Sequence, residues 1–461
     1  MTGARLTIIW VSLYRRASIL ITLFLMISSS RGYSCHHSLT KRFDYKLPVW
    51  AENAFTNLPK SGRLHLASLP TPLYKLVPTK QSEVLGSRSV LKKISDLGIG
   101  LYVKRDDMSG GVETGGNKIR KLEFLLADAL AKESQSVITI GGEQSNHCRA
   151  TAAACKMLGL EPHLILRTRR ANDIGDNKDD LGFCGNILFD RLVGATSYLC
   201  TPGEYGRVGS EQLVSRLSRY LEEKDPERSV YKIPVGGSNG LGTFGYLNAV
   251  NELLSQWHDD ENSSRKLSLD HVVFACGSGG TACGLTLGIA LAHGALEEKF
   301  SSSYQKDPPK VHAVGVCDSP DYFYAFVAKI ADEMGLKLPG DTTTDAFIRE
   351  HMVAHPGNGL GYARSTQEEL DFISDFALET GISLDPVYSG KALYHFVNHV
   401  LATDPEKFRN SNILFVHTGG AIGLYDKGND LISTLQQTAP VERLDIYGKD
   451  TNAIDISKKT T

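Results

Sequence analysis

A regular alternation of short apolar runs with longer amphipathic runs is the feature that most restricts how this chain can fold. Between residues 101 and 235, apolar strand candidates alternate with segments whose apolar residues recur at helical spacing. The first helix candidate, residues 119–132, has four apolar residues on one face: Leu122, Leu125, Leu126 and Ala129. Such alternation is typical of parallel sheets with crossover helices. The sequence therefore predicts an α/β fold with open, mostly parallel sheets.

The same alternation continues to residue 417 with polar interruptions. The expected strands are 101–104, 137–140, 163–166, 196–199, 230–235, 272–276, 311–316 and 413–417. The expected helices are 119–132, 146–158, 186–193, 209–224, 241–256, 279–292, 322–334, 367–380 and 391–402. Charged or Ser-rich connectors are expected at 259–267 and 301–309.

Length and charge narrow the class of protein. The 461 residues are 41% hydrophobic and 22% charged, which is enough for two compact lobes. The net charge of −2 gives no argument for binding nucleic acid or an acidic membrane face. The eight cysteines form no CxxC and no Cys/His metal spacing, so we expect free thiols in a reducing compartment and no metal site.

The N-terminus differs from the rest of the chain. No acidic residue precedes Asp44, and a short apolar run at 18–27 follows Arg15 and Arg16. That run is too short to span a bilayer. It predicts a removable targeting segment over residues 1–43, for a mitochondrion or plastid, with a secretory or bipartite signal and a leader without any address as alternatives.

The stretch from Ser109 to Arg149 contains the first candidate for chemistry. Gly115, Gly116 and Asn117 lead into Lys118, which starts the helix expected at 119–132. The positive end of the helix dipole disfavours an ammonium there and lowers the pKa of the lysine. A lysine with a lowered pKa suits Schiff-base chemistry. Lys121 competes for this role, and an ordinary surface lysine is the alternative.

Two further glycine-rich turns follow apolar strands. Gly141 to His147 places Ser145, Asn146 and His147 at a helix start, where α/β folds hold ligands, although Ser145 or Asn146 could serve as a plain N-cap. Cys276 to Thr281 leaves backbone N–H groups open at another helix start, which suits one phosphate. Its glycine spacing departs from GxGxxG, and the acidic residue expected of a dinucleotide site is missing.

Two stretches in the C-terminal part of the chain contain further candidate site residues. Residues 384–391 place Tyr388 and Ser389 on a proline-set turn before a helix, and Thr418 follows the last strand within His417 to Gly420. Tyr362 lies in a short Gly-Tyr-Ala segment.

Taken together, seven stretches resemble the fold-type II pyridoxal-phosphate enzymes, and more closely their branch of D-cysteine desulfhydrases and 1-aminocyclopropane-1-carboxylate deaminases. They are VKRDD (103–107), GGNKIRKLEFL (115–125), ITIGGEQSNHCRATAAA (138–154), IPVGGSNGLGTFGY (233–246), ACGSGGTACG (275–284), DPVYSGKALY (385–394) and ILFVHTGGAIGLYDK (413–427). The resemblance implies the tryptophan synthase β-like fold, bound pyridoxal 5'-phosphate, a small amino-acid substrate and a homodimer. It also implies a large domain of residues 44–121 and 233–461, with 122–232 inserted as a small domain.

The resemblance implies a role for each matching residue. Lys118 would link covalently to the cofactor and move the substrate's Cα proton, and Asn146 would bond the cofactor O3′. Ser389 would face the pyridine nitrogen. Gly279, Gly280 and Thr281 would hold the cofactor's phosphate, and Asn117, Gly277 and Ser278 would also bind the cofactor. The substrate side would be lined by Ser145, Asn146, His147 and Thr418, with Ser145, Tyr362 and Tyr388 as further catalytic candidates.

Two positions bear on the reaction. In the deaminases Glu typically stands at the position of Ser389 and Leu at that of Thr418, whereas the desulfhydrases carry Ser and Thr. A carboxylate at the pyridine nitrogen maximises the electron sink, while a hydroxyl suffices for β-elimination of a thiolate. We therefore predict β-elimination of D-cysteine to pyruvate, hydrogen sulfide and ammonia. A deaminase giving 2-oxobutyrate and ammonia is the nearer alternative, and a nucleotide-binding dehydrogenase or binding module is the other. Glu143 stands where relatives often carry Ile, on the expected substrate side.

Overall fold

The computed structural model describes residues 39–172, 174, 181–258, 269–300, 307–438 and 441. The chain divides into two units, Met1–Lys41 and Arg42–Thr461, and all the helices and strands described below belong to the second unit. The predicted targeting segment lies almost wholly outside the described residues, as do the connector at 259–267 and most of the connector at 301–309.

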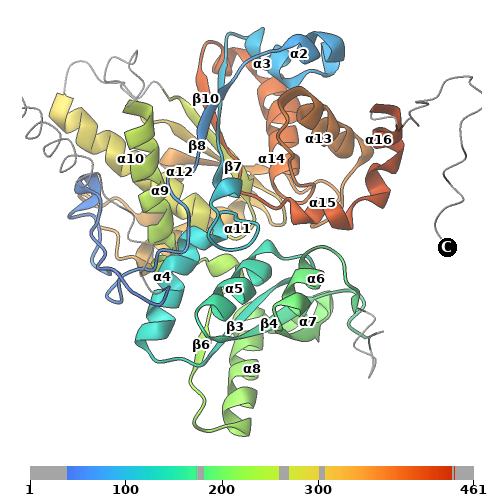
Figure 1. Ribbon diagram of the computed structural model, residues 1–461. Coiled ribbons are helices and arrows are strands. Elements are labelled where there is room, and N and C mark those ends of the chain that lie inside the picture. The colour runs from blue at the N-terminus through green and yellow to red at the C-terminus, as the bar shows by residue number, and fades with distance from the viewer. Residues whose placement is uncertain are drawn as a thin grey trace, which may run out of the picture. The chain divides into compact units, whose positions relative to one another are not determined.

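Two sheets organise the described residues (Figure 1). The six-stranded sheet has the order β1-β2-β10-β7-β8-β9, and only the β1–β2 pair is antiparallel. Its strands are β1 (Leu73–Leu76), β2 (Gly100–Lys104), β7 (His271–Cys276), β8 (Lys310–Gly315), β9 (Met352–Pro356) and β10 (Asn412–Val416). The four-stranded sheet is parallel throughout, in the order β5-β4-β3-β6. Its strands are β3 (Ser136–Gly142), β4 (Glu161–Arg167), β5 (Thr196–Cys200) and β6 (Val230–Lys232). The predicted α/β class with mostly parallel sheets is confirmed.

Helices connect and cover these strands. The first half of the described chain contains α2 (Lys80–Leu85), α3 (Val90–Ser95), α4 (Lys118–Ala131), α5 (Asn146–Met157), α6 (Gly185–Leu192), α7 (Pro202–Val208) and α8 (Ser210–Lys224). The second half contains α9 (Gly240–His258), α10 (Gly280–Phe300), α11 (Pro320–Glu333), α12 (Thr344–His351), α13 (Gln367–Thr380), α14 (Ser389–His395), α15 (Ile422–Asp426) and α16 (Ile432–Thr438).

The inner strands β7, β8 and β10 of the six-stranded sheet are buried on both faces, as expected for a parallel sheet between helix layers. Alternate residues of β7 point to opposite sides. Val272 and Phe274 pack with residues of α9, α10 and α11. Val273 and Ala275 pack with residues of α3, α13 and α14. The helices therefore form two layers that fix the positions of the loops at the strand ends.

The four-stranded sheet has its own helix layers. Val137 packs with apolar residues of α4 and α5, whereas Ile138 and Ile140 pack with those of α8. α4 also packs against α9, which belongs to the layer over the six-stranded sheet, and Figure 1 shows α4 running between the two sheets. α4 thus packs against the helix layers of both sheets. The predicted domain boundaries at 121/122 and 232/233 stay a prediction.

Some elements differ from the sequence-based expectation. The sequence did not predict β1 and β9, the two edge strands of the larger sheet, or the short helices α2, α3, α7, α12, α15 and α16. Each of these segments spans at most eight residues, which is too short to show a clear period. The strand expected at 230–235 ends at Lys232, since Pro234 has no N–H to donate. The helix expected at 391–402 begins earlier as α14 and continues as a π-helix over Phe396–Leu401.

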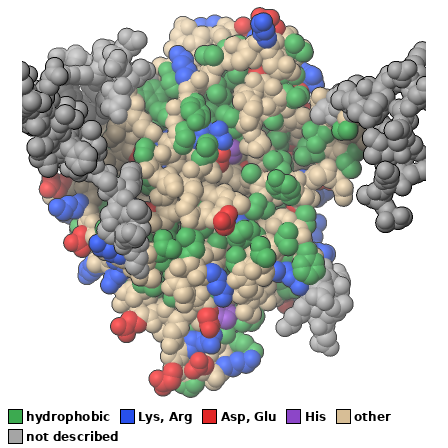
Figure 2. All heavy atoms as spheres, in the orientation of Figure 1, with side chains coloured by type: hydrophobic (Ala, Val, Ile, Leu, Met, Phe, Trp, Pro, Cys, Tyr) green, Lys and Arg blue, Asp and Glu red, His purple; other side chains and the backbone are tan. Residues whose placement is uncertain are grey.

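The surface carries both signs of charge, and the described cysteines form no disulfide. Acidic and basic side chains intermingle over α8 at the foot of Figure 2, so this face carries both signs of charge there. No helix among the described residues is both long enough and apolar enough to cross a membrane. The seven cysteines in the described part of the chain are free, and no cluster of three or more metal-binding side chains occurs among the described residues.

Candidate active site

Lys118 is the first residue of α4, as the sequence predicted, and a turn with two left-handed glycines presents it. Gly115 and Gly116 have φ of 56° and 106°. A Cβ on Gly115 would lie 2.4 Å from the carbonyl oxygen of Asp107, so only glycine fits there. Burial lowers the pKa of Lys118 to about 8. Roughly a tenth of the amine is therefore neutral at pH 7, far more than for an ordinary lysine with a pKa of about 10.4, and this suits a nucleophilic lysine.

Two neighbours hold this turn in place. The Asn117 amide donates to the carbonyl of Thr418, 3.0 Å away, so the turn rests on the loop after β10. The buried Arg149, on α5, donates from Nη2 to the carbonyl of Gly115 at 3.1 Å and from Nη1 to that of Glu113. The loop after β10 and the helix α5 thus fix the start of α4.

The turn after β3 brings Ser145, Asn146 and His147 to the same site. Ser145 caps α5 by accepting from the Cys148 amide at 3.2 Å, so the N-cap interpretation of this serine is correct, and its side chain also lines the main cavity. Asn146 lies beside Lys118 in a smaller cavity and accepts from Asn186 at 3.1 Å. Burial lowers the pKa of His147 well below its usual value, so its imidazole is neutral.

The turn after β7 forms a cradle at the start of α10. Ser238 Oγ joins three groups there: it donates to Ser278 Oγ at 2.9 Å, and it accepts from the Gly280 amide at 3.1 Å and from Lys121 Nζ at 3.2 Å. Asn117 Nδ2 donates to Thr281 Oγ1 at 3.1 Å. Amides, hydroxyls and a lysine at a helix N-terminus make a site for an anion.

Two tyrosines meet across the cavity. The hydroxyls of Tyr362 and Tyr388 lie 2.9 Å apart, and two glycines allow the rings to approach. A Cβ on Gly142 would lie 2.7 Å from Tyr362 Cε1, and one on Gly277 would lie 3.0 Å from Tyr388 Cε1. Burial raises the pKa of Tyr362 to about 12 and that of Tyr388 well above its usual value, so both hydroxyls are protonated at neutral pH.

Ser389 and Thr418, which the sequence singled out separately, are in contact. Ser389 is fully buried at the start of α14. Its Oγ lies 3.3 Å from Thr418 Oγ1 and donates to the carbonyl of Gly419 at 3.2 Å. Asp385 orients this helix start by accepting from the backbone amides of Val387, Tyr388 and Ser389.

The turns described above surround a cavity of about 710 Å³. Side chains or backbone from both sheets line it, including Lys118, Ser145, His147, Ser278, Tyr362 and Tyr388. A second cavity of about 30 Å³ is lined by Lys118, Asn146 and Thr418. The glycines of the turn before α4 and of the loop after β10 also line it. Together the linings of the two cavities include every site residue predicted from the sequence except Gly279, Gly280, Thr281 and Ser389. Of these four, Gly280, Thr281 and Ser389 form hydrogen bonds with lining residues.

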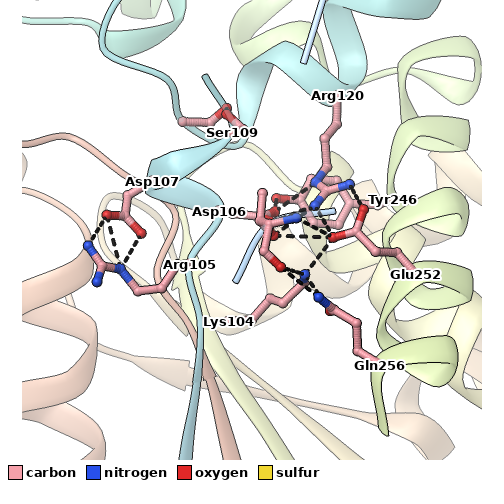
Figure 3. Close-up of polar contacts among 11 residues, drawn as sticks. Lys104, Arg105, Asp106, Asp107, Ser109, Arg120, Tyr246, Glu252 and Gln256 are labelled. Carbon is pink, nitrogen blue, oxygen red and sulfur yellow. Dashed lines mark hydrogen bonds and ion pairs between the residues drawn. The ribbon is translucent and has the colours of Figure 1, made fainter. Parts of the chain in front are cut away.

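A buried ionic network supports α4 from the side of α9 (Figure 3). Arg120, two residues after Lys118, donates to both oxygens of Asp106, at 3.1 and 2.8 Å, and to both oxygens of Glu252, each at 3.0 Å. Tyr246 donates to Asp106 at 2.7 Å, and Lys104 donates to Glu252. Arg120 is therefore a buried structural residue and not the surface charge that helix patterning suggests.

Sequence reasoning missed three contributors to the site. Ser238 and the carbonyl of Gly236, which accepts from Lys121 at 3.1 Å, come from a glycine-rich turn before α9, the same signal that identified the other three turns. The sequence suggests Lys121 only as an alternative to Lys118 for the Schiff-base lysine, but in the structure its ammonium group donates to Ser238 in the cradle. Glu143, expected on the substrate side, instead accepts from Thr168 and pairs with Arg170 outside the cavity lining.

These residues fit pyridoxal phosphate. A buried lysine of lowered pKa stands near an anion cradle, and the two are joined through Asn117. The cradle tolerates no side chain at Gly280, where a Cβ would lie 2.9 Å from Ser238 Oγ and 3.0 Å from Lys121 Nζ. An aldehyde-reactive amine, a phosphate site and a hydroxyl-lined edge at Ser389 match the three parts of this cofactor.

Comparison with known proteins defines the class. The family model described as "Pyridoxal-phosphate dependent enzyme" matches residues 87–419, more than two thirds of the chain. The chain belongs to the pyridoxal-phosphate-dependent enzymes, and pyridoxal phosphate is its cofactor.

Individual relatives narrow the comparison. The chain is 43% identical over 397 residues to "Bifunctional D-cysteine desulfhydrase/1-aminocyclopropane-1-carboxylate deaminase, mitochondrial" of Arabidopsis thaliana, covering 86% of this chain and 87% of that one. It is 32% identical over 366 residues to "D-cysteine desulfhydrase" of Yersinia enterocolitica, covering 76% and 97%. A crystal structure of an "ACC deaminase homologue" superposes with a TM-score of 0.60 at 28% identity, covering 83% of this chain and 97% of that one.

Proposed function

We propose that the protein is a D-cysteine desulfhydrase, which converts D-cysteine and water to pyruvate, hydrogen sulfide and ammonia. The observation that carries this proposal is the side chain presented by the start of α14, a serine hydroxyl in contact with Thr418. Relatives named for both D-cysteine desulfhydration and cyclopropane deamination support the reaction class and the small amino-acid substrate.

The cofactor would be held at three points. The amides of Gly279, Gly280 and Thr281, with Ser278, Ser238, Asn117 and Lys121, would hold the phosphate. Asn146 would bond the ring hydroxyl, and Ser389 would face the ring nitrogen. When bound, pyridoxal phosphate supplies an electron-withdrawing ring that stabilises negative charge at the substrate Cα.

The protein's own groups would handle the protons. Lys118, with its pKa lowered to about 8, can accept the proton from Cα. Tyr388, kept protonated by burial and hydrogen-bonded to Tyr362, would donate a proton to the departing sulfur. The start of α5, with Ser145 and His147, offers amides and a positive dipole end for the substrate carboxylate.

The test is a three-substrate assay. The full-length protein is incubated separately with D-cysteine, L-cysteine and 1-aminocyclopropane-1-carboxylate, and sulfide, pyruvate and 2-oxobutyrate are measured. We expect sulfide and pyruvate from D-cysteine alone, and no turnover by a folded Lys118→Ala variant. Sulfide from L-cysteine at an equal rate, or retained activity in Lys118→Ala, would refute the assignment.

A second candidate function is 1-aminocyclopropane-1-carboxylate deamination. The bifunctional name of the Arabidopsis relative and the 0.60 superposition on a deaminase homologue favour keeping it. Substantial 2-oxobutyrate in the same assay would establish it.

We further infer targeting of the chain to an organelle and assembly as a homodimer. The basic, acid-free N-terminus supports the first inference, as does the word "mitochondrial" in the Arabidopsis relative's name. Imaging of a C-terminal fluorescent fusion, with and without residues 1–43, tests it. Light scattering of the purified protein tests the second.

A further inference from the structure

Arg167 is a cation of the main cavity that has no partner of opposite charge among the described residues. It ends β4 and lines the 710 Å³ cavity. Its guanidinium carbon lies 4.8 Å from the ring centre of Tyr205 and 5.3 Å from that of Tyr362. Within the described part of the chain it takes part in no side-chain hydrogen bond and no ion pair. The exposed Asp318 lines the same cavity but forms no ion pair with it.

The other arginines at this site show what is unusual about Arg167. Arg120 donates to two carboxylates, and Arg149 donates to two backbone carbonyls and to Asn186. A guanidinium keeps its charge at all relevant pH values and presents five donors in one plane. Two aromatic rings fix the plane of Arg167, which leaves its N–H groups available to an anion that enters the cavity.

The position of Arg167 tells which part of a substrate it reaches. It is the register partner of Gly142 in the neighbouring strand, and it lies against the Tyr362 ring, whose hydroxyl bonds Tyr388. The α-carboxylate already has a place at the start of α5 in the proposed function. An anion at Arg167 therefore belongs to the outer end of the group attached to Cβ.

We propose that the protein also eliminates β-substituents that carry a negative charge, and that Arg167 is the specificity residue that binds this charge. The inference rests on the proposed β-elimination. With O-phospho-D-serine and water, the products are pyruvate, ammonia and inorganic phosphate. The Cα proton passes to Lys118 and its electron pair forms the Cα=Cβ bond, while the Cβ–O bond breaks and its electron pair leaves with the phosphate. Water then hydrolyses the aminoacrylate to pyruvate and ammonia, and no oxidant or reductant is needed.

The experiment compares three substrates of the holoenzyme: O-phospho-D-serine, the uncharged O-acetyl-D-serine, and D-cysteine. We expect Arg167→Gln to lower kcat/KM for O-phospho-D-serine by about 10- to 100-fold, the loss typical of hydrogen bonds to a charged group. We expect the same variant to lose much less with O-acetyl-D-serine and with D-cysteine, whose β-substituents carry no phosphate charge, and we expect Arg167→Lys to lose less than Arg167→Gln with O-phospho-D-serine. Arg219→Gln, at an exposed position of α8, removes the same charge from the surface as a control.

A binding measurement separates this inference from the proposed function. D-2-amino-3-phosphonopropionate has the charge but no leaving group, so calorimetry reports its affinity without turnover. Weaker binding to Arg167→Gln supports the inference even if D-cysteine is not consumed, which would refute only the proposed function. Equal losses for all three substrates would overturn it, because Arg167 would then bind the α-carboxylate. Unchanged phosphonate binding would also overturn it.

Discussion

Ser389 Oγ lies 3.3 Å from Thr418 Oγ1, although 28 residues separate the two in the sequence. Both side chains are buried, and Ser389 also donates to the carbonyl next to Thr418. The pair therefore forms one hydroxyl-lined edge beside Asn146 and Lys118, not two independent positions.

The first prediction concerns this pair. In Ser389→Glu/Thr418→Leu, a carboxylate replaces the hydroxyl that we propose faces the ring nitrogen. It would hold a proton there and strengthen the electron sink. We expect the ratio of 2-oxobutyrate formed from the cyclopropane substrate to sulfide formed from D-cysteine to rise. Ser389→Ala is the control that removes the hydroxyl without adding charge. An unchanged ratio would show that this edge does not select the reaction.

The second prediction concerns Tyr388 and Tyr362. Burial keeps both hydroxyls protonated, and Tyr388→Phe removes the hydroxyl that we propose donates the proton to sulfur. We therefore expect kcat for D-cysteine to fall by about 100-fold, within the usual range for general acid catalysis. Tyr362→Phe removes only the hydrogen-bond partner and should cost less. The double variant should be no slower than Tyr388→Phe, because the two act as one unit. The measurement is steady-state kcat of the two single variants and the double variant. Losses in kcat that multiply in the double variant would contradict a shared role.

The glycine-rich turns were the most predictable part of the site. Each combines glycines, a strand end and a helix start within a few residues, so Lys118, Ser145 and Gly280 were identified without knowledge of the fold. The strands with two buried faces were equally visible, because β7 and β10 are continuous apolar runs. Both features are predictable because each depends only on residues that are close together in the sequence.

Long-range convergence was not predictable from one sequence. Lys121 and Ser238 meet at 3.2 Å across 117 positions, and Arg120 meets Glu252 across 132. Arg120, Lys121 and Glu123 all look like surface charges on a helix, yet all three are buried. Helix patterning identifies the apolar face but cannot show that α9 and the turn before it cover the polar face of α4 as well.

The third prediction concerns the ionic network of Figure 3. Arg120→Met leaves Asp106 and part-buried Glu252 without their main partner, and breaking a buried ion pair from one side costs about 3–5 kcal/mol. We expect a loss of this size in the free energy of urea unfolding. Lys132→Gln removes an exposed pair at the end of the same helix and should cost less than about 1 kcal/mol. Equal losses in both variants would mean that the network adds no stability beyond a surface pair.

A chain of three histidines gives the last prediction. His312 shares hydrogen bonds with His271 at 3.0 Å and with His355 at 2.9 Å, across three adjacent strands. Burial lowers the pKa of His271 and of His355 to about 4, and that of His312 well below its usual value. Lys310, Lys407 and His395 disfavour protonation further, while Asp270 opposes this effect at His271.

Because these folded-state pKa values lie below the unfolded value of about 6.5, the unfolded chain binds more protons in acid. The stability of the folded protein is therefore fully present above pH 6.5 and falls as the pH drops toward 4. We expect His312→Leu to flatten this slope in urea unfolding measured at several pH values, whatever its effect at pH 7. His399→Gln, which removes an exposed histidine outside the chain of three, should leave the slope unchanged. A slope identical in all three proteins would show that the acid sensitivity arises at other buried groups.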